Sequence, residues 1–220
     1  MNHPLIESAK RIEGEVFLGG PLRIFESAGR NQFVLLLQQG LNPHSNVLDI
    51  GCGCLRGGYW LIRFLDAGCY FGIEPNEKML EAGKREIVGD ELLSAKRPKF
   101  DCNDRFDLTA FGEVRFDFFM GGSIWTHAPK KQIRIMLERF SEFGSRDAVF
   151  LASYIRAKDE GEDYRGEEWV GKSHHSDKAG LVMHRLEALQ AMAKEYSLSV
   201  RPLAPNLFRR VTWLVVQKRS

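Results

Sequence analysis

The chain has 220 residues, which favours one domain with a decoration, because a typical domain has roughly 150 residues. Hydrophobic residues make up 44% and charged residues 27% of the sequence, so a wholly disordered chain is excluded. The 31 basic and 29 acidic residues leave a formal charge of +2, which provides no single-signed field to attract nucleic acid or an anionic membrane.

Local features disfavour four further classes of protein. The longest stretch without formal charge, residues 31–48, is broken by Gly40 and Pro43, so no membrane-spanning helix is expected. The first ten residues lack the basic and apolar regions of a secretory signal, and we therefore expect a cytoplasmic location. Four cysteines are too few for a disulfide scaffold, and Cys52 and Cys54 lack the spacing of a zinc site, so no metal is predicted.

Taken in chain order, the elements alternate as in βα units. Residues 1–40 are mostly helix-like and end at the break Gly40–Pro43, which predicts a helical segment ahead of a sheet. Short apolar runs and longer amphipathic runs then follow one another. The expected strands are Val47–Ile50, Cys69–Ile73, Lys99–Cys102, Phe116–Met120, Ala148–Tyr154 and Val211–Gln217, and the expected helices are Gly57–Leu65, Pro75–Val88, Pro129–Phe143 and Leu181–Tyr196. The segment Ser197–Pro202 lies between the last helix and the last strand.

A glycine-rich turn follows the first expected strand, in the run Val47-Leu48-Asp49-Ile50-Gly51-Cys52-Gly53. In a doubly wound sheet, ligands bind at such a turn, where glycines let the backbone approach closely and a helix N-terminus offers free N–H groups. A dinucleotide site requires a third glycine at position 56, which is Arg. Asp49 suits an ammonium group, and Glu74, after the next strand, suits the hydroxyls of a ribose. A ligand with an amino-acid end and a ribose is S-adenosylmethionine (SAM).

The run VLDIGCG, followed by FGIEPN, resembles motif I and the acidic second-strand motif of class I SAM-dependent methyltransferases. The resemblance covers roughly residues 41–154 and implies an α/β fold: a single doubly wound Rossmann-like domain whose seven-stranded sheet is mostly parallel, with helices on both faces. It implies that Asp49, Gly51 and Gly53 line the methionine end of SAM and that Glu74 binds the ribose. Leu55 stands where many members have a third glycine, which leaves the course of the turn open.

The same resemblance extends to the remaining parts of the site. After the third expected strand, Asn103, Asp104 and Phe106 are candidates for holding the adenine, although a polar turn with a buried Phe106 is the alternative. Gly121 and Ser123 follow the fourth strand and are expected to border the reactive sulfonium. The stretch Ser123–His127 resembles the S-x-x-x-H stretch of small-molecule methyltransferases, and it lacks the Asn/Asp-Pro-Pro-aromatic motif of amino-group methylators.

The base for an oxygen acceptor is predicted to be His127, because a hydroxyl must lose its proton during attack. A histidine that caps a helix or binds a core carbonyl is the alternative, and His174, His175 and His184 are rival bases. The polar segment Arg156–Gly180 follows the fifth strand and is interpreted as a lid-like insertion, with a solvated loop as the alternative. Its expected acceptor-binding residues are Tyr164, Trp169, His174 and His175.

The sequence therefore predicts residues 1–40 as an N-terminal helical cap of the same domain and residues 41–220 as the SAM-binding core, with an insertion at 156–180. The favoured function is methyl transfer from SAM to a hydroxyl of a small molecule or glycan. A catalytically silent SAM-binding regulatory protein and a nucleic-acid methyltransferase are the alternatives, and the second is disfavoured because no basic face is visible. The oligomeric state is left open.

Overall fold

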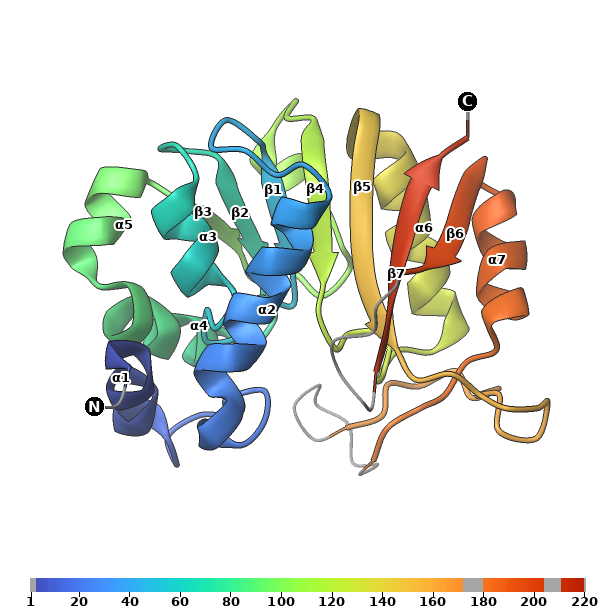
Figure 1. The fold of residues 1–220 in the computed structure, drawn as a ribbon, viewed down its shortest axis with the longest axis horizontal. Coiled ribbons are helices and arrows are strands. Elements are labelled where there is room, and N and C mark those ends of the chain that lie inside the picture. The colour runs from blue at the N-terminus through green and yellow to red at the C-terminus, as the bar shows by residue number, and fades with distance from the viewer. Residues whose placement is uncertain (1–2, 172–179, 204–210, 220) are drawn as a thin grey trace. The chain divides into compact units, whose positions relative to one another are not determined.

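The structure, a computed structural model, describes residues 3–171, 180–203 and 211–219 (Figure 1). Over these residues the strands form a seven-stranded sheet with the order β3-β2-β1-β4-β5-β7-β6. The chain divides into two compact units, residues 1–112 and residues 113–220. No helix of the described residues is long and apolar enough to cross a membrane.

The first unit begins with helices and then alternates strands and helices. Its three strands are parallel, with β1 paired to β2 and β2 paired to β3, so their carboxyl ends share one edge. Every residue of β1 and β2 is buried, as expected of parallel strands covered on both faces. The elements are α1 (Pro4–Ile12), η1 (Leu22–Ile24), α2 (Phe25–Gln38), β1 (Val47–Ile50), α3 (Gly58–Phe64), β2 (Tyr70–Ile73), α4 (Glu77–Gly83), the π-helical η2 (Lys84–Val88), α5 (Asp90–Lys96), β3 (Lys99–Asp101) and η3 (Thr109–Phe111).

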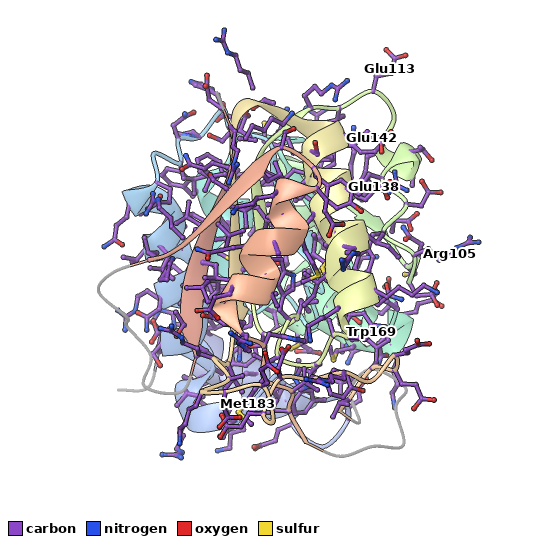
Figure 2. All side chains as sticks on the ribbon, turned by 90° about the vertical axis from the view of Figure 1, so that its right-hand side faces the viewer. Arg105, Glu113, Glu138, Glu142, Trp169 and Met183 are labelled. Atoms are coloured by element: carbon purple, nitrogen blue, oxygen red, sulfur yellow. The ribbon has the colours of Figure 1, made fainter. Side chains whose placement is uncertain are left out.

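The second unit holds one parallel and two antiparallel strand pairs: β4 with β5, β5 with β7, and β6 with β7. The helix α6 buries an apolar stripe, Ile133, Met136, Leu137 and Phe140, whereas Glu138 and Glu142 point away from the sheet (Figure 2). Its helices and strands are β4 (Phe116–Gly121), α6 (Lys130–Phe143), β5 (Gly144–Tyr154), α7 (Leu186–Lys194), β6 (Leu198–Pro202) and β7 (Thr212–Lys218).

Two expected elements differ from the structure. The helix expected from Leu181 begins only at Leu186, because the N–H of Val182 donates to Thr126 and the N–H of His184 donates to Ile155. These bonds hold residues 182–184 in extended backbone. The strand expected from Ala148 starts at Gly144, where the exposed Arg146 and Asp147 concealed the strand pattern. The short helix α5 had no predicted counterpart.

Candidate functional site

The turn after β1 runs through three residues with left-handed backbone. Gly51 has φ +68°, Gly53 has φ +57° and Leu55 has φ +63°. The N–H groups of Gly51 and Cys52 both donate to the carbonyl of Ile73, at 2.8 and 3.1 Å, which ties the turn to the end of β2. Leu55 therefore adopts the conformation of the glycine that it replaces, and its buried side chain fixes the turn from the protein side.

Asp49 is a buried acid near the end of β1. Its side chain is 6% exposed, and its Oδ2 accepts a hydrogen bond of 2.8 Å from the Tyr70 hydroxyl. Burial raises the pKa of Asp49 to about 7, although the hydrogen bond from Tyr70 and the charge of Arg56 oppose that rise. A cationic ligand bound beside Asp49 would lower this pKa, so that the carboxyl group would be fully ionised at neutral pH.

Glu74 follows β2 and is equally buried, with 6% of its surface exposed. Its Oε2 accepts from the N–H of Gly53 at 2.9 Å, and its Oε1 accepts from the N–H of Asn76 at 2.9 Å. The structure therefore brings the predicted pair Gly53 and Glu74 into direct contact. A carboxylate has about four lone-pair sites, so each oxygen of Glu74 retains capacity for a further donor.

Three residues of this region were not predicted as site residues. Gln32 of α2 is buried, and a Cβ at Gly57 would lie 2.7 Å from its Oε1 and 3.6 Å from Oδ2 of Asp49. Tyr70 orients Asp49, as described above. Arg56 donates from Nη1 to the carbonyl of Gly19 at 3.0 Å. A buried Gln inside an apolar helix, and an Arg inside a glycine-rich turn, were the available sequence signals.

The three predicted adenine-binding candidates in the loop after β3 differ in burial and in their contacts. Oδ1 of Asn103 accepts from the N–H of Asp107 at 2.8 Å, and its amide nitrogen donates to the carbonyl of Asp107 at 3.0 Å. The Asn103 side chain therefore holds its own loop in shape. Asp104 is exposed, whereas Phe106 is buried with φ +55°.

In the second unit, Gly121 is the last residue of β4 and Ser123 lies in the turn beyond it. Ser123 has φ +63°, and its N–H donates to the Ser153 hydroxyl at 2.7 Å. The Thr126 hydroxyl donates to the Ser123 carbonyl at 2.9 Å. Polar side chains from two segments of the unit thus fix this turn.

His127 is paired with a backbone carbonyl, as in the alternative considered from the sequence. Its Nδ1 lies 2.7 Å from the Val170 carbonyl, and the N–H of Val170 donates to the His127 carbonyl at 2.9 Å. Burial lowers the pKa of His127, which favours the neutral imidazole at pH 7. An Nδ1–H donated to that carbonyl leaves Nε2 as the basic nitrogen.

The described part of the insertion, residues 156–171, is anchored by side chains and backbone. Lys130 lies 2.9 Å from Asp163 and also donates to the Tyr164 carbonyl. Trp169, labelled in Figure 2, belongs to this loop and is half-buried. His174 and His175 lie outside the described residues.

His184, the rival base, is completely buried. Its Nε2 lies 3.1 Å from the Ala128 carbonyl, and its ring contacts that of Tyr164 at a centroid distance of 6.4 Å. Burial lowers the pKa of His184 to about 4. Because no edge of its ring is exposed, His184 packs in the interior, where it contacts Tyr164 of the insertion.

No family model matches the chain, and no curated protein matches it. Solved structures do match. Magnesium protoporphyrin IX methyltransferase from Synechocystis PCC 6803, solved with SAM, has a TM-score of 0.65 at 15% identity, over 97% of this chain and 90% of that one. DhpI with bound S-adenosylhomocysteine (SAH) has a TM-score of 0.63 at 14% identity, over 99% and 98%.

The chain has the fold of SAM-dependent methyltransferases. A third structure, the O-methyltransferase NcsB1 from neocarzinostatin biosynthesis, contains SAH and 1,4-dihydroxy-2-naphthoic acid. It matches with a TM-score of 0.58 at 17% identity, over 85% of this chain and 53% of that one. The α/β, Rossmann-like, mostly parallel fold expected from the sequence is thereby confirmed.

Proposed function

We propose that this protein is a SAM-dependent methyltransferase that transfers a methyl group to a hydroxyl of a small molecule. The observation that carries the proposal is the contact between Glu74 and the N–H of Gly53, with the buried Asp49 at the tip of the neighbouring strand. Two acids at adjacent parallel strand ends, joined by a glycine-rich turn, match a ligand that has an ammonium group and a ribose. The shared fold with SAM- and SAH-bound methyltransferases supports the same ligand.

The residues of the first unit fit this cofactor. Asp49 would bind the ammonium group, and Gly51 and Gly53 would line the methionine end. Space at the turn is limited, because a Cβ at Gly53 would lie 3.1 Å from the Met79 methyl, so a side chain there would crowd the turn. Glu74 would accept the ribose hydroxyls. With the Asn103 amide engaged in its own loop, Asp104 and Phe106 are the better adenine candidates.

Bound SAM supplies an electrophilic methyl group on a sulfonium. Gly121 and Ser123 are proposed to border that sulfonium, because they end β4 and its turn is held rigid by Ser153 and Thr126. Tyr164 and Trp169 are proposed to contact the acceptor, and His174 and His175 remain candidates of the same segment. Positioning of the two reactants supplies most of the rate enhancement for such a displacement.

His127 is proposed to accept the proton of the acceptor hydroxyl. Its lowered pKa keeps the imidazole neutral at pH 7, the form that a general base requires. Its bond to the Val170 carbonyl fixes the ring orientation, and fixed orientation is what proton transfer needs. The presence of a dihydroxynaphthoic acid in NcsB1 supports an oxygen acceptor of small size.

Calorimetric titration tests the cofactor, using SAM, SAH and NAD as ligands. We expect binding of SAM and SAH without added metal and no binding of NAD. Glu74→Gln should weaken SAM by about 10- to 100-fold, the usual effect of losing a charge-assisted hydrogen bond. The exposed Glu91→Gln, on α5, is the matched control and should bind SAM like the parent protein. Binding of NAD alone would refute the proposal.

Methyl transfer is then measured from SAM labelled in its methyl group, with a panel of hydroxylated small molecules and glycans as acceptors. Labelled product from one of these acceptors supports the proposed reaction. Binding of SAM without transfer to any acceptor would point to a silent regulatory protein. Transfer to RNA or DNA in preference to the panel would identify a nucleic-acid methyltransferase and refute the small-molecule assignment.

A further inference from the structure

Arg56 is a cation with few partners inside the glycine-rich turn. Arg56 is half-buried, and burial lowers the pKa of its guanidinium. Arginine offers five N–H donors, yet the guanidinium of Arg56 makes one hydrogen bond to the described residues, from Nη1 to the Gly19 carbonyl. Part of the residue still reaches solvent. A half-buried arginine that leaves most of its donors unused by the described residues has the properties of an anion-binding group.

The guanidinium is held in place by the N-terminal segment. The Gly19 carbonyl binds one of its ends, and a Cβ at Gly19 would lie 3.4 Å from Nη1. The main chain of Arg56 packs closely on α2, where Gly29 leaves space for the Arg56 carbonyl. The position of the charge is thus fixed from two sides, which lowers the entropy lost when an anion binds.

Arg56 lies within electrostatic reach of Asp49 but does not neutralise it. The positive charge lowers the pKa of Asp49, yet burial outweighs this effect. No ion pair joins the two side chains in the part of the chain that the structure describes. The side chains of Gln32 and Asp49 both lie next to Gly57, so the Gln32 amide is close to the Asp49 carboxylate. A carboxylate, a guanidinium and an amide at one turn form the complement of a zwitterion.

We infer that Arg56 binds the α-carboxylate of the cofactor's amino-acid end, while Asp49 binds its ammonium group. The inference rests on the proposed function, because it concerns how SAM is selected. Charge pairing at both ends of the zwitterion satisfies the buried carboxylate and the half-buried guanidinium, which do not pair with each other. It also gives the arginine a selective role in place of the glycine that a dinucleotide turn requires at position 56.

The experiment compares two ligands that differ only in the carboxylate: SAM and decarboxylated SAM. Calorimetry with the full chain measures both affinities for the parent protein and for Arg56→Gln. The parent should bind decarboxylated SAM about 10- to 100-fold more weakly than SAM, as expected for a charge-assisted pair. Arg56→Gln should weaken SAM by the same factor and change the affinity for decarboxylated SAM less than about threefold.

Two control variants separate recognition from structure. Arg63→Gln removes an exposed guanidinium of α3 that donates to the Tyr59 carbonyl, and it should leave both affinities unchanged. Arg56→Lys keeps the charge without the two-pronged geometry and should lose only part of the preference for SAM. Unfolding temperatures measured for each variant confirm that the compared proteins are folded.

The outcomes distinguish this inference from the proposed function. If the parent protein binds neither ligand, the proposed function fails and the inference fails with it. If the parent prefers SAM and Arg56→Gln keeps that preference, or weakens both ligands equally, the inference alone is overturned. Equal weakening would make Arg56 a structural residue of the turn, anchored to Gly19.

Discussion

Replacing Asp49 with Asn should stabilise the ligand-free protein at neutral pH. The carboxyl group is buried, and its pKa is raised from 3.8 to about 7, mainly by burial. A carboxyl whose pKa is higher in the folded state than in the unfolded state binds its proton more tightly when folded. The protonated Asp49 carboxyl makes its full contribution to stability below the pKa that it has in the unfolded chain. This contribution is lost as the pH rises through the folded-state pKa of about 7. Asparagine has no such cost, and its oxygen can still accept from Tyr70.

The magnitude follows from the shift. About three pKa units at about 1.4 kcal/mol per unit give a cost of about 4 kcal/mol once Asp49 is ionised above pH 7. Part of that cost is already present at pH 5, where the unfolded carboxyl is mostly ionised. The free energy of unfolding of Asp49→Asn, minus that of the parent, should therefore increase by about 2–3 kcal/mol between pH 5 and pH 8.

Urea denaturation at pH 5, 6, 7 and 8 measures this difference. The exposed Asp147→Asn of β5 is the control, and its difference from the parent should not depend on pH. The stabilised Asp49→Asn should at the same time lose affinity for SAM, because an amide provides no charge for the ammonium group. A difference that stays constant from pH 5 to pH 8 would refute the reasoning, since Asp49 would then titrate as an exposed acid does.

Three further changes give distinct outcomes. Leu55→Gly should lower the free energy of unfolding by about 1–3 kcal/mol, because the loss of the buried side chain outweighs the relief of the strained positive φ. Urea denaturation measures this change, and a stabilised variant would contradict the reasoning. Lys130→Met removes one partner of Asp163 and the donor to the Tyr164 carbonyl, so hydrogen exchange at the Tyr164 and Val170 amides should accelerate. The exposed Lys131→Met should leave this exchange unchanged. His127→Gln should slow methyl transfer by roughly 10²–10⁴-fold and abolish a rate increase whose midpoint in the parent lies below pH 6.5, while SAM affinity stays the same. An unchanged pH–rate profile would exclude His127 as the base.

The cofactor half of the candidate site was predictable because its signals are local. Asp49 and Glu74 each follow a short apolar run, and parallel pairing of two such runs brings their ends to one edge. The contact between Glu74 and the Gly53 N–H follows from that register and from the backbone of the turn. The local signals at Arg56 and Gln32, an arginine in a glycine-rich turn and a glutamine in a helix, do not reveal their roles, because their positions depend on how α2 and the Gly19 segment pack on the turn.

Other residues were ambiguous because one side chain has several uses. Asn103 has donors and acceptors that suit an adenine, but those same groups stabilise a turn, and the turn is closer in sequence. His127 shows both possibilities together: its Nδ1 is bound to a core carbonyl, while its ring remains only partly buried. The insertion was predicted from its length, its polarity and its place after the fifth strand, and these features do not reveal the backbone bonds between Val170 and His127.

Asp49 illustrates why a destabilising residue indicates function. The protein forgoes several kcal/mol at neutral pH by keeping a buried carboxyl that an asparagine would replace without loss of the Tyr70 bond. Glu74 is equally buried, yet two backbone N–H groups compensate it, so its burial has a structural explanation. Among the residues that the structure describes, Asp49 has one neutral side-chain donor, Tyr70, and a nearby arginine that does not pair with it. A cationic ligand therefore provides the charge partner that the folded chain does not give to Asp49. The free energy lost by burying the carboxylate without a partner is regained when that ligand binds.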